Sequence, residues 1–482
     1  MAKQESLKEK TAKGLMWGGL SNALQQLLGL VFGIILARKL SQSDYGMIGM
    51  LAIFSAIASC MQEGGFIAAL NRKKEVSQRD YNAVFWASVL TSIGFYLLFF
   101  FTAPLIARFY GVPELTALAR YSFLSFLFVS FSIAPRAYIF RNMMVKESSI
   151  ISIAAVFLSG VLGVVMAING FAYWGIATQV IAYTLTVSLL NYYFSGWRPS
   201  LSIDLSPIKE MIGFSSRLIA TNLFKAINTN VLSVLIGRFF TPCEVGNFTQ
   251  AEKWNSLGHS FITNSLYSIA QPVFSKVQDD KLRQKMVFRK LLRFTSFVSF
   301  PALFCLSLVS EEFITILITD KWIESAHILR MLCIAGALMP ISFLFSNLLI
   351  SQGHSSAYMW ITISQILAQL LAVGLSVPYG MNRMVLTFVV INILWVLIWF
   401  LFAHKGICMS TYEAILDVSP YFVLSLASIA ISYYTTLGIT NIYLALFSKI
   451  AIAVAVYCIA LWLLGSTIFK ETIHFIVKKE IL

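Results

Sequence analysis

The chain has 482 residues, of which 58% are hydrophobic and only 12% are charged, and its mean hydropathy is +0.77. A soluble protein carries about a quarter charged residues, so this composition excludes a soluble globular protein. It predicts an all-α polytopic membrane protein, because the apolar runs are about 20 residues long and can each cross a hydrocarbon core. The net charge of +14 fits the basic cytoplasmic loops of such proteins and does not by itself indicate nucleic-acid binding.

Hydropathy predicts about fourteen membrane-spanning helices with short connections, none of which can form a separate soluble domain. The predicted spans lie near residues 14–36, 46–70, 82–103, 115–135, 148–168, 172–194, 213–236, 246–270, 291–310, 327–350, 357–377, 383–403, 418–436 and 442–465. Because most Lys and Arg residues gather in the loops on one side, both termini are predicted to be cytoplasmic.

The stretch 279–290 is basic, and its apolar residues recur periodically. This pattern predicts an interfacial helix against anionic lipid, between the eighth and ninth spans. The helix is either a topology anchor or a regulatory or partner site.

The first and seventh spans match one another at an offset of 200 residues. The first copy has Ser21, Asn22, Gln25, Arg38, Ser41, Asp44 and Gly46, and the second has Thr221, Asn222, Lys225, Arg238, Thr241, Glu244 and Gly246. A second match, at an offset of 210, relates Glu114 and Arg120 to Glu324 and Arg330. Two homologous bundles around a shared cavity would explain the matches and would be the build of a transporter. Chance agreement between apolar segments is the alternative.

The seventh span carries a polar stripe, which consists of Arg217, Thr221, Lys225 and Asn228. These positions lie within roughly 80° of the helix surface. A lysine near the middle of a membrane is costly unless it faces water or an acid. We therefore expect Lys225 and Arg217 to line a wet cavity for an anionic substrate, with Asn222 beside them.

The first span has the corresponding face in neutral form, with Asn22, Gln25 and Gln26 among Gly18, Gly29 and Gly33. This face either lines the cavity or packs closely against another helix, as small residues do in membranes.

Two further ionisable residues fall within predicted spans. Glu63 is taken as the only carboxylate well inside an apolar span. It is either a coupling site for a proton or sodium ion or a structural partner of Arg217 or Arg136. Lys449 lies mid-span, and its position leaves its role open.

Four arginines lie at the outer ends of spans in matched pairs: Arg38, Arg238, Arg120 and Arg330. Paired guanidinium groups suit phosphate. The alternative role, which we favour for most of them, is structural pairing with Asp44, Glu244, Glu114 and Glu324.

No motif in the chain indicates an enzyme. A P-loop, HExxH and GxSxG are absent, the six cysteines are scattered without metal spacing, and only five histidines are present. We therefore expect no metal and no cofactor. A membrane-embedded sugar polymerase or ligase would need a large outward loop, which the short connections do not provide.

Several segments resemble a known family. Ile35–Gly46 resembles the "LARxLSPxDYG" first loop of the polysaccharide transporter (Wzx-type repeat-unit flippase) family, within the multidrug/oligosaccharidyl-lipid/polysaccharide flippase superfamily, with Gln42 in place of the proline. The other segments similar to the family lie at Gly64–Lys74, Asn82–Trp86, Ala103–Tyr110 and Phe274–Asp280.

The resemblance implies two pseudo-symmetric six-helix lobes in a V, over residues 1–200 and 201–410, and two C-terminal helices with a cytoplasmic tail over 411–482. It also implies export of lipid-linked sugar repeat units on undecaprenyl pyrophosphate across a bacterial inner membrane. The expected partners are this substrate and membrane lipids, with a proton or sodium counter-ion and polysaccharide polymerase machinery as further candidates. The family has no universal catalytic set, so the cavity residues rest on the physical argument above.

Two alternative functions share the architecture. A lipid II flippase for cell-wall synthesis differs mainly in its substrate. A multidrug–cation antiporter would need a carboxylate in the cavity, whereas the seventh span is basic.

Overall fold

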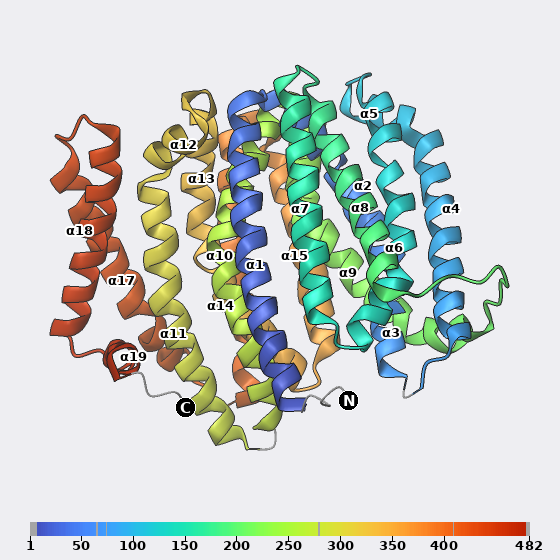
Figure 1. Ribbon diagram of the computed structural model, residues 1–482. Coiled ribbons are helices and arrows are strands. Elements are labelled where there is room, and N and C mark those ends of the chain that lie inside the picture. Colours follow the sequence, from blue (N-terminus) through green and yellow to red (C-terminus); the bar gives the residue numbers. More distant parts are fainter. Residues whose placement is uncertain (1–6, 64–65, 74, 278–279, 408, 479–482) are drawn as a thin grey trace. The chain divides into compact units, whose positions relative to one another are not determined.

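The computed structural model describes residues 7–63, 66–73, 75–277, 280–407 and 409–478, which form α-helices and short 3-10 turns without a strand among them (Figure 1). Some side chains within these helices lie outside the description, among them those of Glu63, Arg217, Thr221 and Lys225. The chain forms two compact units, Met1–Gly246 and Asn247–Leu482. The three-part division at residues 200 and 410 stays a prediction.

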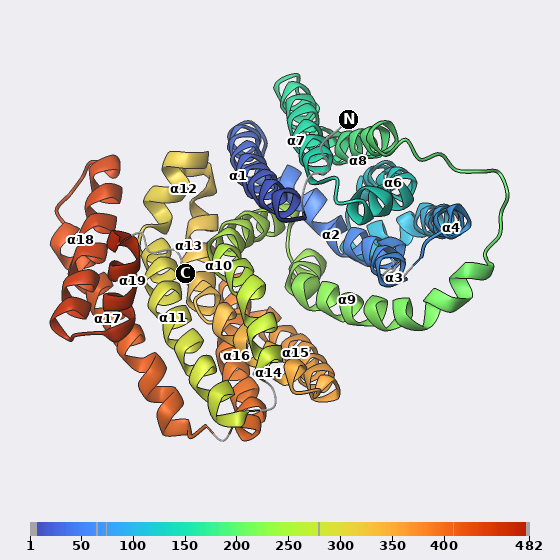
Figure 2. The ribbon, with the colours of Figure 1, turned by 60° about the horizontal axis from the view of Figure 1, so that its bottom comes forward.

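The first unit is a bundle in which α7 packs between α1 and α8, α6 packs against α4 and α8, and α9 packs against α2, α3 and α4. Figures 1 and 2 both show α1 and α7 side by side. The helices of this unit are α1 (Leu7–Lys39), α2 (Gln42–Glu63), α3 (Phe66–Arg72), α4 (Gln78–Tyr110), α5 (Leu115–Ser122), α6 (Leu124–Arg141), α7 (Val145–Ile168), α8 (Tyr173–Ser195), α9 (Ser206–Phe239) and the first turn of α10 (Pro242–Lys276).

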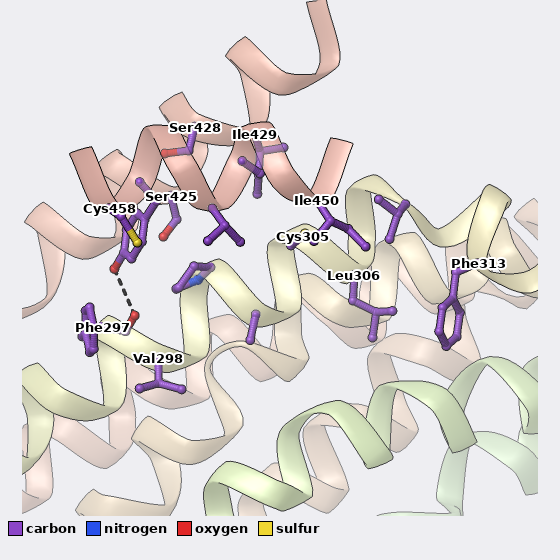
Figure 3. Close-up of a pocket in the computed structure, with 16 residues that line it drawn as sticks. Phe297, Val298, Cys305, Leu306, Phe313, Ser425, Ser428, Ile429, Ile450 and Cys458 are labelled. Atoms are coloured by element: carbon purple, nitrogen blue, oxygen red, sulfur yellow. Dashed lines mark hydrogen bonds between the residues drawn. The ribbon is translucent and has the colours of Figure 1, made fainter. Parts of the chain in front are cut away.

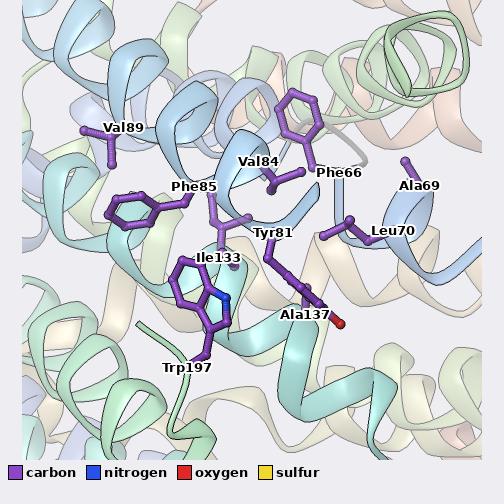
Figure 4. Packing of buried hydrophobic residues seen from close by; sticks show 11 residues of the cluster. Phe66, Ala69, Leu70, Tyr81, Val84, Phe85, Val89, Ile133, Ala137 and Trp197 are labelled. Atoms are coloured by element: carbon purple, nitrogen blue, oxygen red, sulfur yellow. The ribbon is translucent and has the colours of Figure 1, made fainter. Parts of the chain in front are cut away.

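One end of this unit is held by an aromatic and aliphatic cluster (Figure 4). Phe66 and Leu70 of α3 meet Tyr81 and Phe85 of α4, and Trp197 closes the cluster from the connection after α8. Aromatic side chains bury a large apolar area each, so the cluster fixes both the short α3 and the start of this connection.

Polar contacts fasten the same connection, Gly196–Leu205, to the beginning of α4. Asn82 accepts the Ser200 backbone N–H at 2.9 Å and donates to the Ser202 carbonyl, while Arg79 Nε donates to Asp204 at 2.6 Å. Hydrogen bonds from Ser206, aided by Arg79, lower the pKa of Asp204 to about 2. The connection, which contains the predicted boundary at residue 200, therefore packs as part of the first unit.

In the second unit, α11 is the central helix and packs against α13, α14, α17 and α18. Figures 1 and 2 show α17 and α18 together at its side. The helices of this unit are the rest of α10, α11 (Lys281–Leu308), α12 (Ser310–Ile318), α13 (Ile323–Gly336), α14 (Met339–Ser351), α15 (Ser355–Ser376), α16 (Met381–Ala403), α17 (Thr411–Thr436), α18 (Ile442–Leu463) and α19 (Thr467–Lys478), with 3-10 turns at Asp320–Trp322, Val377–Tyr379 and His404–Ile407.

Twelve helical stretches of the described residues are long and apolar enough to cross a membrane. They match the predicted spans except the seventh and eighth. At those two spans α9 and α10 have 34 and 35 residues, which is ample length, but they are not among the twelve. The all-α polytopic fold is confirmed, and the count of fourteen stays a prediction.

Candidate functional site

The predicted cavity stripe lies on α9, but three of its side chains, Arg217, Thr221 and Lys225, lie outside the described residues. Of the other two residues, Asn222 is exposed and Asn228 is half-buried. The Oδ1 atom of Asn228 has no hydrogen-bond partner in the described part of the protein. The cationic character of the stripe therefore stays a prediction.

On the matching face of α1, only some of the polar side chains are available to line a cavity. Gln25 turns back along its own helix, because its Nε2 donates to the carbonyl and to the Oγ of Ser21, at 3.2 and 2.8 Å. Asn22 and Gln26 are exposed. A Cβ placed on Gly29 would have no described atom within 4 Å, so no tight helix contact occurs at that glycine. Since α1 packs mainly on α7, and α9 on α2 and α4, different neighbours support the two polar faces.

Several polar residues of the match at an offset of 200 residues cap the N-terminal ends of two helices. Ser41 donates from its N and Oγ to Asp44, at 2.8 and 2.7 Å, and Thr241 does the same to Glu244, at 2.9 and 2.8 Å. Each pair satisfies donors at a helix N-terminus, where no intrahelical acceptor exists. The carboxylates of Asp44 and Glu244 thus cap α2 and α10.

The repeated glycines let these two helix starts touch. A Cβ on Gly46 would lie 1.7 Å from the Pro242 carbonyl oxygen, and a Cβ on Gly246 would lie 1.8 Å from that of Gln42. Any side chain there would force the backbones apart. Much of the internal match therefore reflects capping and close packing, so it is no guide to substrate contacts.

The outer arginines mostly have structural partners. Arg238 donates to the Phe109 carbonyl at 2.8 Å, and Arg120 donates to the Phe100 carbonyl at 3.2 Å with its guanidinium 4.4 Å from the Phe100 ring. Arg330 pairs with Glu311 at 2.8 Å rather than with Glu324. Arg38 is exposed. These contacts favour the structural role, although with other partners than those predicted.

The basic stretch 279–290 is not a separate interfacial helix. From Lys281 onward it is the first part of α11, capped by Asp280. Two of its cations bind acids of α17: Lys285 binds Glu413 at 2.7 Å, and Arg289 binds both Glu413 and Asp417. Sequence periodicity could not show this, because the acidic partners lie more than 100 residues away in the chain.

The role that the sequence left open for Lys449 is also resolved. Its ammonium binds the Glu312 carboxylate, so α18 is joined to α12 by an ion pair whose side chains are each 14% exposed. Lys449 does not simply extend its ammonium towards lipid headgroups.

An apolar groove of about 500 Å³ lies in the second unit, between α11, α12, α17 and α18 (Figure 3). It is lined by Phe297, Val298, Pro301, Ala302, Cys305, Leu306, Val309, Phe313, Ser425, Ser428, Ile429, Ile450, Ala453, Val454, Tyr457 and Cys458. Its few polar groups are largely turned to backbone: the Tyr457 hydroxyl donates to the Phe297 carbonyl at 3.0 Å, and Ser428 donates within its own helix. The walls therefore suit a hydrocarbon chain.

The sequence did not reveal this groove, because apolar side chains at helical spacing are typical of core and of lipid-facing surfaces alike.

One carboxylate within a predicted span was missed in the sequence analysis. The prediction that Glu63 is the only one inside a span is wrong, because Glu252 lies on α10 within the predicted span 246–270.

A family model described as "Polysaccharide biosynthesis protein" matches residues 35–327. Among curated relatives, the lipopolysaccharide biosynthesis protein WzxC of Escherichia coli (strain K12) is 25% identical over 89% of this chain and 88% of its own length. The teichuronic acid biosynthesis protein TuaB of Bacillus subtilis (strain 168) is 24% identical over 74% of each chain.

Two kinds of solved structure share the fold. The lipid II flippase MurJ, in an inward closed conformation, aligns with a TM-score of 0.75 at 15% identity, over 95% of this chain and 100% of MurJ. An inward-facing multidrug resistance MATE family transporter of the MOP superfamily aligns with a TM-score of 0.64 at 16% identity, over 80% and 94% of the two chains. These neighbours are membrane flippases and transporters, not enzymes. The chain belongs to the polysaccharide biosynthesis protein family.

Proposed function

We propose that this protein is a flippase that moves undecaprenyl-pyrophosphate-linked oligosaccharide repeat units from the inner to the outer leaflet of a bacterial inner membrane. The units would serve O-antigen, capsule or exopolysaccharide assembly. Both termini would lie in the cytoplasm. The proposal is supported by family membership and by relatives whose names refer to lipopolysaccharide and teichuronic acid biosynthesis.

The apolar groove is the structural observation that carries the proposal. A polyprenyl-linked sugar has an aliphatic tail and an anionic, strongly hydrated head. The groove between α11, α12, α17 and α18 suits the tail. Lipid shelters hydrocarbon equally well, so the groove gains little free energy by holding the tail. We infer that it orients the substrate instead, so that the head enters a polar cavity.

The head would be bound by the polar faces of α9 and α1. Lys225 and Arg217 would attract the pyrophosphate, and the neutral residues would bind sugar or phosphate by hydrogen bonds. Those neutral residues are Asn22, Gln25, Gln26, Thr221, Asn222 and Asn228. Alternating exposure of this cavity to the two sides of the membrane would carry the head across without opening a pore.

The test is reconstitution in liposomes with labelled undecaprenyl-pyrophosphate oligosaccharide, followed by measurement of the label that becomes accessible on the far leaflet. Lys225→Ala should abolish flipping in a protein that still elutes as a folded monodisperse species. Lys209→Ala, an exposed lysine near the start of the same helix, is the matched control and should flip at the wild-type rate. Normal flipping by Lys225→Ala would remove that residue from the proposed site.

A second pair of variants tests the groove. Ile450→Trp places a large ring among the lining residues and should slow flipping of the full-length lipid more than that of a short-chain analogue. Leu444→Trp, at a more exposed position of α18, is its control and should slow neither. Movement of lipid II alone, or of a cationic dye alone, would favour the lipid II flippase or the multidrug–cation antiporter in place of the proposal.

A further inference from the structure

One face of α10 carries two titratable residues that the proposed cavity does not use. Glu252, Asn255 and His259 are spaced i, i+3 and i+7 in the part of α10 that belongs to the second unit. At about 100° per residue they fall within roughly 60° of the helix surface, and His259 lies about two turns beyond Glu252. Ionisable residues within membrane helices are functional candidates by default.

The carboxylate of Glu252 has one protein hydrogen bond among the described residues. Asn255 Nδ2 donates to Glu252 Oε2 at 3.2 Å. Asn255 is itself 4% exposed and lies against α13. A Cβ on Gly336 of that helix would lie 2.2 Å from Asn255 Oδ1, so the glycine makes room for the amide. The amide that orients Glu252 is thus fixed by helix packing.

The cluster contains buried polar atoms that the described protein does not satisfy. Asn255 Oδ1 and His259 Nδ1 are both buried without a hydrogen-bond partner there. Buried polar atoms in native proteins are nearly always paired, so unpaired ones need an explanation. Asn255 donates a hydrogen bond to the carboxyl group, while its own Oδ1 has no partner among the described residues. This arrangement suits a carboxyl group that gains and loses a proton.

No cation on the surrounding helices neutralises Glu252 in the described structure. On α10 itself, the Lys253 ammonium lies 5.8 Å from the Trp254 ring centre. On α13, Cys333 is buried, and Arg330 and His327 are close to Glu311 of α12. The other acid of α12, Glu312, is bound to Lys449. On the side of α11, a Cβ placed on Gly258 would lie 3.0 Å from Leu303 and 3.3 Å from Leu306, both of which are apolar.

We propose that Glu252 is a proton-binding site in which Asn255 orients the carboxyl, and that His259, about two turns along the same face of α10, is a second proton-binding group of the same path. The inference rests on the proposed function, because it supplies the counter-ion for that transport. A half-buried carboxylate with one amide donor is costly in the charged form. A conformational change that alters its access to water would therefore bind or release a proton, and would couple a proton gradient to the movement of the helices.

A proton fits this site better than a metal cation. The described residues contain no group of three or more His, Cys, Asp or Glu side chains that could hold a metal ion. One carboxylate and one amide oxygen offer few ligands to a cation that prefers several oxygens. The test includes a sodium arm for this reason.

The first measurement does not depend on the substrate. Infrared difference spectra of the purified protein, recorded during a pH titration, should show a protonated carboxyl stretch that is missing in Glu252→Gln. Glu252→Asp should keep the band at a shifted position. Glu471→Gln, which removes an exposed carboxylate of α19, is the matched control and should leave the band unchanged. An identical band in wild type and Glu252→Gln would overturn the proposal.

The second measurement uses proteoliposomes with lipid-linked oligosaccharide. Glu252→Gln should lose about 5- to 150-fold of the flipping rate driven by a pH gradient, the range of typical coupling free energies. Flipping without a gradient should persist. His259→Gln should lower the gradient-driven rate by a smaller factor. If a sodium gradient alone drives flipping of the wild type, the proton assignment is wrong. If the infrared band behaves as expected but no polysaccharide lipid moves, the site stands and the proposed function fails.

Discussion

Two carboxylates of the second unit show opposite ways of placing an acid among membrane helices. Asp417 of α17 is 1% exposed, and both of its oxygens are bound by arginines of α11: Arg289 at 2.6 and 3.0 Å, and Arg293 at 2.5 Å. Glu252 of α10 is half-buried, and its only hydrogen bond among the described residues comes from an amide. The first acid is bound by two arginines, whereas no cation of the described residues lies within ion-pair distance of the second.

The two environments suit different roles, because a fully paired acid suits a structural contact and an acid without a compensating charge suits a functional site. When a buried charge is fully paired, the cost of its desolvation is largely compensated, and the charge keeps its partners. At Asp417 this holds α17 to α11 next to the apolar groove. Charge that lacks compensation responds to small changes of environment, which is what a coupling site requires. Burial alone would have ranked Asp417 first as a functional candidate, but hydrogen-bond satisfaction reverses the order.

The largest expected effect comes from removing the paired acid. Asp417→Ala leaves two arginines uncompensated at the α11–α17 contact and should destabilise the protein by about 3–5 kcal/mol. The thermal midpoint in detergent, followed by fluorescence-detected size exclusion, checks this. Glu471→Ala, which breaks the exposed pair with Lys290, is the matched control and should hardly move the midpoint. A small effect of Asp417→Ala would mean that the number of partners of the carboxylate does not distinguish Asp417 from Glu252.

An intermediate effect is expected at the pair of Lys449 and Glu312, which is partly buried and has one carboxylate oxygen without a hydrogen-bond partner among the described residues. Lys449→Met should cost about 1.5–3 kcal/mol, because a charged group loses its hydrogen bond. The double variant Lys449→Met/Glu312→Gln should recover part of that loss, since no unpaired charge remains. Equal stability of the single and double variants would show that the pair does not couple.

The smallest effect is expected at the exposed pair of Arg79 and Asp204. Exposed ion pairs contribute little to stability, so Arg79→Ala should lower the thermal midpoint less than Lys449→Met does. The pKa of Asp204 is lowered to about 2, so its contribution is complete above the unfolded pKa of about 4 and is lost as pH falls towards 2. The effect of Arg79→Ala should therefore be constant between about pH 5 and pH 8. A midpoint difference that changes across that range would contradict this ionisation.

Some features of the chain are visible in a single sequence and others are not, as particular residues show. The polar stripe of α9 is visible because its period is local. The partners of Arg289 and Arg293 are not, since Glu413 and Asp417 lie far along the chain and nothing in a single sequence relates them. The groove is also hidden in the sequence, because Phe297 and Ile450 resemble any other apolar residues of a membrane helix. Glu252 could have been found, because it lies within a predicted span.

Composition and hydropathy were enough to identify an all-α, multi-pass membrane protein, and the chain belongs to the polysaccharide biosynthesis protein family. Hydrocarbon must be crossed by about 20 apolar residues with every backbone group bonded internally, and that rule acts segment by segment. Which charges are neutralised, and which apolar faces leave a groove, became visible once the helices were packed together. Those properties depend on the distances between side chains of different helices, and such distances cannot be inferred from one helix alone.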